Sequence, residues 1–123
     1  MRRQGSAAVE AAVLFGVVAL LGLGVVEWGH YLHHRAVVVG AVQEGAARAV
    51  VTTSTGDYVG AATSQVQDSL TRAGLTMGSV TVTLEGEAPA PVVVVATAPY
   101  APIQGLVPVP IEVVASHVML MER

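Results

Sequence analysis

The sequence predicts an α+β protein with a long N-terminal helix, a second, shorter helix and a three-stranded antiparallel sheet. Three observations lead to this fold class. Residues 6–51 contain no proline and change from apolar to amphipathic along their length. A second helical pattern follows a polar break near residue 55, and beyond residue 79 apolar and polar residues alternate with a period of two. With 123 residues, the chain has room for one small domain.

The composition excludes several classes of protein. The chain is 53% hydrophobic but only 4% aromatic, and its formal net charge is −3. Its six basic residues form no basic patch, so nucleic acid is not an expected partner. The absence of cysteine excludes disulfides, thiol catalysis and cysteine–zinc sites.

The first element is an apolar segment fit to cross a membrane. Ala7–Val26 supplies the roughly 20 apolar residues that a transmembrane helix needs. Arg2 and Arg3 precede this segment, so the positive-inside rule predicts a cytoplasmic N-terminus, with the remainder of the chain across the membrane. Trp28 and Tyr31 follow it, where an interfacial aromatic belt is expected.

One carboxylate interrupts this segment. Glu10 lies five residues past Gly5, which is the spacing of a type IV prepilin cut after a glycine. An ionised carboxylate in hydrocarbon costs several kcal/mol unless it is paired, protonated or close to water. Cleavage before Ser6 would place a new α-amino group about one helical turn away, as a counter-charge. An uncleaved single-pass anchor is the alternative, and an ordinary signal peptide is a third, although the apolar run exceeds its usual 7–15 residues.

Small side chains recur along the same segment. They lie at four-residue intervals, with one member two intervals further on, at Ala8, Ala12, Gly16 and Gly24. In lipid, such spacing lets helix backbones approach closely. We expect this stripe, near Glu10, to pack against other helices.

The helical pattern continues beyond the membrane segment to about Val51, with Gly22, Gly24 and Gly29 as candidate bends. Two further glycines in this outer half, at positions 40 and 45, are expected to mark close packing. A polar break at residues 52–56 ends the first helix.

Asp57 is a candidate N-cap for a second helix, Tyr58–Ala73, and Gly74 is its C-terminal signal. The apolar face of this helix is predicted to consist of four residues, Val59, Ala62, Val66 and Leu70.

Three strands complete the chain. Residues 79–85 alternate, and a turn at residues 86–90 leads to a valine-rich strand, Pro91–Ala98, which Pro99–Pro102 is expected to break. After an irregular connection ending near residue 110, Ile111–Met121 forms the third strand. Its predicted inner face comprises Ile111, Val113, Ala115, His117, Met119 and Met121. We expect the sheet to pack on the outer half of the long helix.

Three histidines are the most chemically suggestive group. His30, His33 and His34 share a helix face and could supply zinc ligands, but Glu27 is the nearest acidic residue. Their place at the membrane boundary favours a structural role, so we expect no metal site and no cofactor. His117 is expected to be a core or edge residue of its strand. No serine lies in a Gly-x-Ser-x-Gly motif, and the glycines near residue 24 do not follow a strand, so no catalytic residue and no enzyme activity are expected.

Taken along its length, the sequence resembles the TadE-like family, the minor pilins or pseudopilins of tight-adherence (Tad/Flp) pilus systems. The resemblance rests on Gly5–Glu10, Gly24–Gly29, Ala41–Arg48 and Pro99–Ile103, with a final strand ending in Met121–Arg123. It implies cleavage by a prepilin peptidase between Gly5 and Ser6, with Glu10 as the assembly glutamate. Ala11 stands where the family usually has an aromatic residue, and Gly16 where it often has proline.

The prediction is therefore a structural pilin-like subunit in three parts. Residues 1–5 form a leader, 6–26 a transmembrane assembly helix, and 27–123 an extracytoplasmic head that includes the outer half of the helix. Expected partners are other pilin or pseudopilin subunits, the prepilin peptidase and the inner membrane. The alternatives are an uncleaved, membrane-anchored envelope binding protein and a type II secretion pseudopilin.

Overall fold

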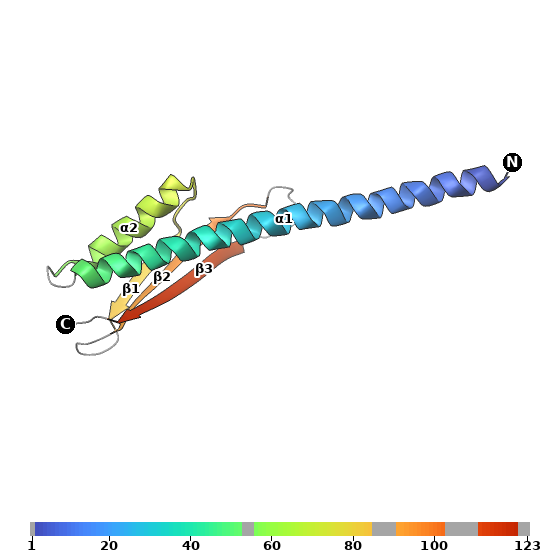
Figure 1. Ribbon diagram of the computed structural model, residues 1–123. Helices are drawn as coiled ribbons and strands as arrows, with labels where there is room; N and C mark the ends of the chain where they lie inside the picture. Colours follow the sequence, from blue (N-terminus) through green and yellow to red (C-terminus); the bar gives the residue numbers. More distant parts are fainter. Residues whose placement is uncertain (1, 53–55, 85–90, 103–110, 121–123) are drawn as a thin grey trace.

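The computed structural model of the protein describes residues 2–52, 56–84, 91–102 and 111–120. Its elements are helices α1 (Arg2–Thr52) and α2 (Tyr58–Arg72) and strands β1 (Ser79–Leu84), β2 (Pro91–Tyr100) and β3 (Ile111–Leu120). The head consists of α2, the sheet and the outer half of α1, whereas the N-terminal half of α1 projects alone (Figure 1). The predicted α+β order of two helices followed by three strands is confirmed.

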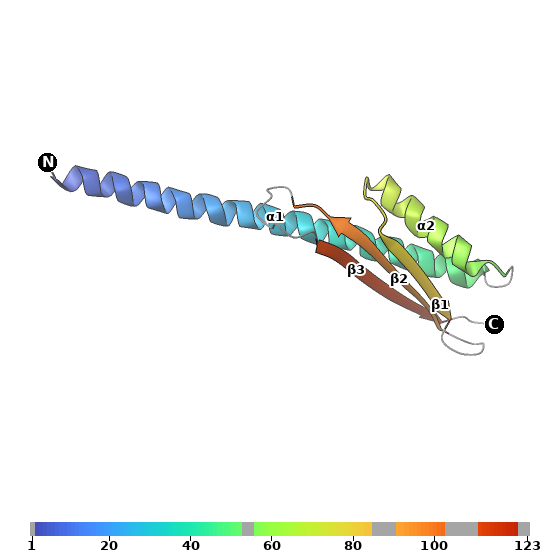
Figure 2. The same cartoon turned by 180° about the vertical axis from the view of Figure 1, so that it is seen from behind.

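Helix α1 is one continuous helix of 51 residues, about 75 Å long. The predicted helix, Ser6–Val51, is confirmed and extends slightly at both ends. Gly22, Gly24 and Gly29 all lie within it, and the ribbon curves gently through them without a sharp kink (Figure 2). The glycines therefore do not break the helix between the projecting half and the head.

Helix α2 is bounded as its end signals predict. The Asp57 Oδ1 atom accepts a hydrogen bond from the Gly60 N–H at 3.1 Å, which satisfies one free donor of the first turn. At the other end Gly74 has φ +74°, and the Leu75 N–H donates to the Leu70 carbonyl at 2.9 Å. This is a Schellman motif, which needs a residue with positive φ and therefore favours glycine.

Three of the four residues predicted for the apolar face of α2 are buried: Ala62, Val66 and Leu70. The prediction that Val59 is buried with them is wrong, since 43% of it is exposed. Around the helix, Val59 lies only about 20° from Val66, so it is exposed because it stands in the first turn, which begins at Tyr58, and not because it faces another side.

The sheet has the order β1-β2-β3, and both pairs are antiparallel, as predicted. The expectation that Pro99 breaks β2 is wrong, because the strand continues to Tyr100 and Pro99 pairs with Glu112. Strand β1 flanks β2 only as far as Thr97, so Pro99 lies where one side of β2 has no neighbour strand among the described residues. Proline, which has no N–H to donate, is tolerated in such an edge position.

Alternate residues of β2 enter the core, from Val92 to Tyr100. On β3, Val113 and Ala115 are buried, while His117 and Met119 are half-buried, so these four members of the predicted inner face are confirmed. The other two, Ile111 and Met121, have side chains outside the described part of the chain, as do the predicted turn at 86–90 and the connection ending near 110.

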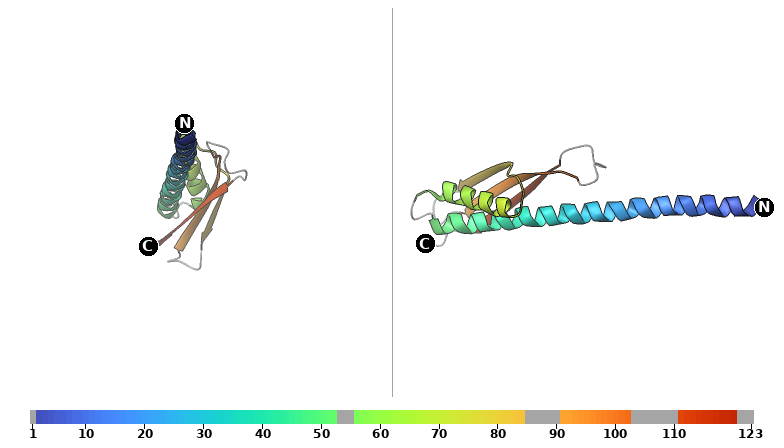
Figure 3. Two further views of the ribbon diagram at one scale, coloured as in Figure 1. Left: turned by 90° about the vertical axis from the view of Figure 1, so that its right-hand side faces the viewer. Right: turned by 90° about the horizontal axis from the view of Figure 1, so that it is seen from above.

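Both helices cover one face of the sheet, with α1 over β2 and β3 and α2 beside β1 (Figure 3). The core between the layers consists of Val38, Ala41, Val42, Ala46, Ala49, Ala62, Val66, Leu70, Val92, Val94, Ala96, Ala98, Tyr100, Val113 and Ala115. The predicted packing of the sheet on the outer half of α1 is thus confirmed.

The two glycines expected to mark close packing behave differently. A Cβ on Gly45 would lie 2.5 Å from the Val66 Cγ2 atom and 3.2 Å from the Ala62 carbonyl oxygen. A Cβ on Gly40 would meet nothing within 4 Å. Gly45 therefore allows α1 and α2 to approach, and the expectation for Gly40 is wrong.

Candidate functional site

The projecting half of α1 carries a long apolar surface that no other described element covers. Every residue from Gly5 to Val26 is exposed, and Phe15 reaches 77%. This part of α1 is long and apolar enough to cross a membrane. Ala7–Val26 alone would span about 30 Å, the thickness of the hydrocarbon core of a bilayer.

The predicted processing and assembly residues lie together on the first turns of this half. Gly5 and Ser6 are helical and exposed. The Ser6 Oγ atom donates a hydrogen bond of 3.3 Å to the Glu10 Oε1 atom, one turn further along. Residue 6 is thus near enough for its backbone amine, if freed, to approach the carboxylate.

The small residues predicted to mediate packing, Ala8, Ala12, Gly16 and Gly24, are also exposed. A Cβ on Gly16 or Gly24 would meet nothing within 4 Å, so neither glycine is required by the fold of the single chain. Helical geometry places Glu10 about 160° from both Ala8 and Ala12 but only about 40° from Gly24, because steps of four residues drift by about 40° around the helix. The carboxylate therefore faces away from the first two members of the stripe and shares a side with the last.

At the boundary between the two halves, the predicted interfacial pair is brought together. The ring centroids of Trp28 and Tyr31 lie 5.7 Å apart, at an interplanar angle of 33°. Trp28 is 63% exposed, whereas Tyr31 is half-buried against the core. Tyr31 thus belongs to the head as well as to the predicted belt.

A polar contact that the sequence did not predict lies at the same level. The Tyr100 hydroxyl donates to the Glu27 Oε1 atom at 2.5 Å, and it lies 3.4 Å from the Glu27 carbonyl oxygen. Only 3% of Tyr100 is exposed. Burial, and then the hydrogen bond and charge of Glu27, raise the pKa of Tyr100 to about 12. In β2, Ala96 and Ala98 point into the core. Continuing this alternation by two residues places Tyr100 on the same face, and this pattern is the signal that could have predicted the contact.

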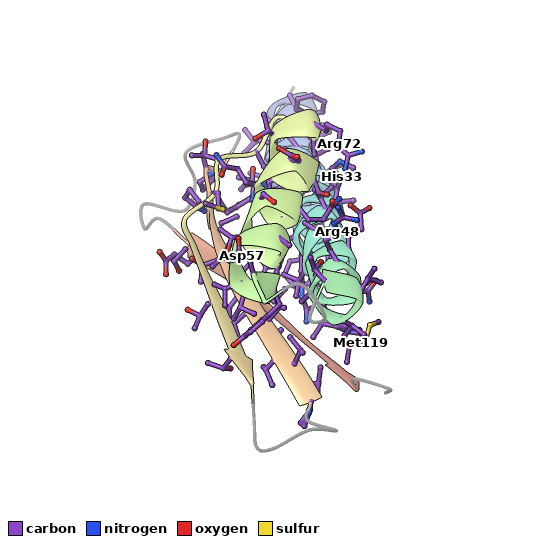
Figure 4. The ribbon with its side chains drawn as sticks, turned by 90° about the vertical axis from the view of Figure 1, so that its left-hand side faces the viewer. His33, Arg48, Asp57, Arg72 and Met119 are labelled. Carbon is purple, nitrogen blue, oxygen red and sulfur yellow. The ribbon has the colours of Figure 1, made fainter. Side chains whose placement is uncertain are left out.

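The three histidines do not converge on one point. His34 is buried, and its ring lies edge-on to Tyr100 at 5.2 Å, while the His30 ring lies 5.5 Å from Tyr100. His33 is exposed on the side of α1 away from the sheet (Figure 4). Burial lowers the pKa of His34, and repulsion from His30 and His33 lowers it further. Among the described residues, no group of three or more histidine, aspartate or glutamate side chains is placed to hold a metal ion.

A second polar group joins α1 and α2 at the far part of the head. Glu44 accepts hydrogen bonds from Ser69 and, at 3.3 Å, from Gln65, and it forms an ion pair of 3.5 Å with Arg72. The two hydrogen bonds, followed by the charge of Arg72, lower the pKa of Glu44. The ion pair is largely exposed, so we assign it to the helix–helix contact.

Comparison with protein families gave one informative result, and comparison with curated proteins and with solved structures gave no match. A family model described as TadE-like protein matches residues 5–47. The matched segment contains Gly5 and Ser6, which are the predicted processing residues, then Glu10, and it continues into the part of α1 that packs in the core. The resemblance predicted from the sequence is therefore confirmed over residues 5–47, and the chain contains a TadE-like segment.

Proposed function

We propose that this protein is a pilin-like structural subunit, without catalytic activity, that takes part in assembly of a tight-adherence pilus. The observation that carries the proposal is the fully exposed half of α1, with Glu10 one turn from Ser6, within the segment that matches the TadE-like family. An apolar helix exposed all round must be covered by lipid, by other helices or by both in turn. A pilin subunit needs both environments, first in the membrane and then in the fibre.

In this proposal, residues 6–26 anchor the subunit in the inner membrane with the N-terminus cytoplasmic and the head outside. The prepilin peptidase removes residues 1–5, and the amine released at Ser6, from the same or a neighbouring subunit, neutralises Glu10. The small residues from Ala8 to Gly24 form the contact with neighbouring helices. Trp28 and Tyr31 lie at the membrane surface.

The role of Glu10 is tested by replacing it with glutamine, which retains the shape of the side chain and removes its charge. We expect Glu10→Gln to insert into the membrane normally and to be lost from sheared pilus fractions. Leu14→Ala is the matched control, since Leu14 is an exposed neighbour one turn away, and it should assemble. Normal assembly of Glu10→Gln would contradict the assembly role.

The cleavage site is tested by intact mass measurement of the protein from its native membrane. We expect a chain that starts at Ser6, and a Gly5→Val variant that retains residues 1–5. Gly22→Val is the matched control, because Gly22 is also an exposed helical glycine, and it should still be cleaved. A native chain that retains residues 1–5 would instead identify the protein as an uncleaved membrane anchor.

A type II secretion pseudopilin would give the same two results, because it shares the leader logic. The two machines are distinguished by deleting the Tad secretion ATPase. We expect this deletion to remove the protein from the pilus fraction, and assembly that is unaffected would place the subunit in a different machine.

A further inference from the structure

One side chain attaches the end of β2 to α1 where the head meets the projecting half of the helix. The ring of Tyr100 lies edge-on to Tyr31 at 5.4 Å and to His34 at 5.2 Å, and its hydroxyl donates to Glu27. Glu27 and His34 are two turns apart, so Tyr100 contacts about 10 Å of the helix.

Within this contact, His34 is suited to only one protonation state. The side chain is 6% exposed, and its Nε2 atom is buried with no hydrogen-bond partner in the described part of the chain. A neutral imidazole can leave one nitrogen as an unprotonated acceptor, whereas an imidazolium has an N–H at both nitrogens. Protonation would therefore leave a charged, buried donor without an acceptor, which is costly.

The groups around His34 offer little compensation for a positive charge. On α1, His30 and His33 would carry the same positive charge as His34 when protonated. Burial is the larger cause of the lowered pKa of His34, and repulsion from these two histidines lowers it further. From β2, the Tyr100 ring packs edge-on against His34 and carries no charge. The carboxylate of Glu27 lies two turns away and accepts the Tyr100 hydroxyl.

In the parts of β3 and α2 that the structure describes, no charged group is found to compensate His34. Strand β3 pairs with the end of β2 through Glu112, which is opposite Pro99 and exposed, whereas the next residue, Val113, is buried. On α2, the basic residue of the last turn is Arg72. Arg72 forms an ion pair with Glu44, which lies ten residues beyond His34 on α1.

We propose that Tyr100 and His34 form a proton-sensitive clasp, in which protonation of His34 releases the end of β2 from α1. The rest of the head stays attached through the core beyond this point, which begins on α1 at Val38 and Val42. This clasp is a property of the folded head, so it holds whether or not the protein assembles into a pilus.

The direction of the pH dependence follows from the lowered pKa of His34. The open state binds the proton more tightly than the closed state, so the clasp is complete above the ordinary histidine value of 6.5 and weakens as the pH falls below it. Because one proton is involved, the opening constant rises by at most about tenfold for each pH unit.

Trp28 provides the readout, since it is the single tryptophan of the chain and its ring lies 5.7 Å from Tyr31, which contacts Tyr100. The full chain in detergent micelles is titrated from pH 8 to pH 5 while its tryptophan fluorescence and the NMR signal of the His34 ring are recorded. We expect one transition in both signals, at the same pH and below 6.5.

Three variants decide which group is responsible. His34→Gln should abolish the fluorescence transition, and His34→Phe, which keeps a ring, should do the same if the glutamine variant is poorly folded. His33→Gln, at an exposed neighbouring histidine, and Glu27→Gln, which retains an acceptor for Tyr100, should preserve it. A transition that persists in both His34 variants, or that disappears in Glu27→Gln, would overturn the proposal, as would titration of His34 without a change in Trp28.

Discussion

The two halves of α1 form one continuous helix, but one half is exposed along its whole length and the other is packed into the head. Between Gly5 and Val26 every residue is exposed, including large apolar side chains such as Phe15. Between His34 and Ala49 one stripe is buried under the sheet and α2, while the other side carries polar residues such as Glu44 and Arg48. The α-helix itself runs through both halves without a break.

The apolar residues of this helix therefore serve two distinct purposes. The outer half is amphipathic, so the sheet and α2 of the same chain bury its apolar stripe. The projecting half is apolar all round, which a single chain of this size cannot cover. Stability of the head should therefore depend on the outer half, and membrane insertion or assembly on the projecting half.

Truncating one leucine in the head and one in the projecting half should give the largest difference in stability between the two regions. Leu70→Ala, in the centre of the core against α1, should lower the free energy of unfolding by about 2–5 kcal/mol. Leu20→Ala, in the projecting half, should leave the unfolding of the head unchanged. Denaturant unfolding of the full chain in detergent, followed by circular dichroism, measures both. Equal losses would show that the two halves are not energetically separate.

At the boundary between the halves, Tyr100 attaches the end of β2 to α1. Tyr100→Phe keeps the ring contacts and removes the hydrogen bond to Glu27, so it should cost about 1.5–3 kcal/mol, as for bonds to charged groups. The same unfolding measurement tests this value, and an unchanged stability would contradict a role for the hydroxyl.

The Tyr100 contact should also respond to alkali. The folded pKa of about 12 lies above the ordinary value of 10.0, so the hydroxyl contributes stability below pH 10 that is lost as the pH rises toward 12. We expect a Trp28 fluorescence change in this range that is absent in Tyr100→Phe.

Within the outer half, two glycines test which side of α1 is packed. Gly45→Ala should destabilise the head by about 1–3 kcal/mol, because its Cβ would press on Val66. Gly40→Ala, in open space on the same helix, should be neutral or stabilise by up to about 1 kcal/mol. Thermal unfolding of the two variants gives the comparison, and equal effects would contradict the close approach at Gly45.

The smallest effect is expected on the exposed side of the outer half. Glu44→Gln should lower stability by about 0–1 kcal/mol, as is usual for an exposed ion pair, and less at high salt. Because the pKa of Glu44 is lowered in the fold, its contribution is present above pH 4.5 and lost as the pH falls through the lowered value. Unfolding at pH 7 and pH 3 should differ less in the variant than in the parent chain.

Much of the fold could be predicted because its signals are local. The absence of proline before residue 89, the Asp57 and Gly74 end signals of α2 and the alternation of β1 each act over a few neighbouring residues. The wrong predictions concern residues whose structure depends on an element distant in the sequence. Pro99 is compatible with a strand because β1 stops beside Thr97, and nothing near Pro99 in the sequence contains that information.

The same contrast applies to the candidate site. The apolar run, Glu10 and its spacing from Gly5 are properties of the linear sequence, since a helix that projects alone obtains its geometry from helical periodicity. By contrast, only the tertiary structure decided that His34 is buried while His33 is exposed, that Gly45 is packed while Gly40 is not, and that Tyr100 reaches Glu27. Each depends on which side of α1 the sheet and α2 cover, and that choice is made by long-range packing of the whole core rather than by any neighbouring residue.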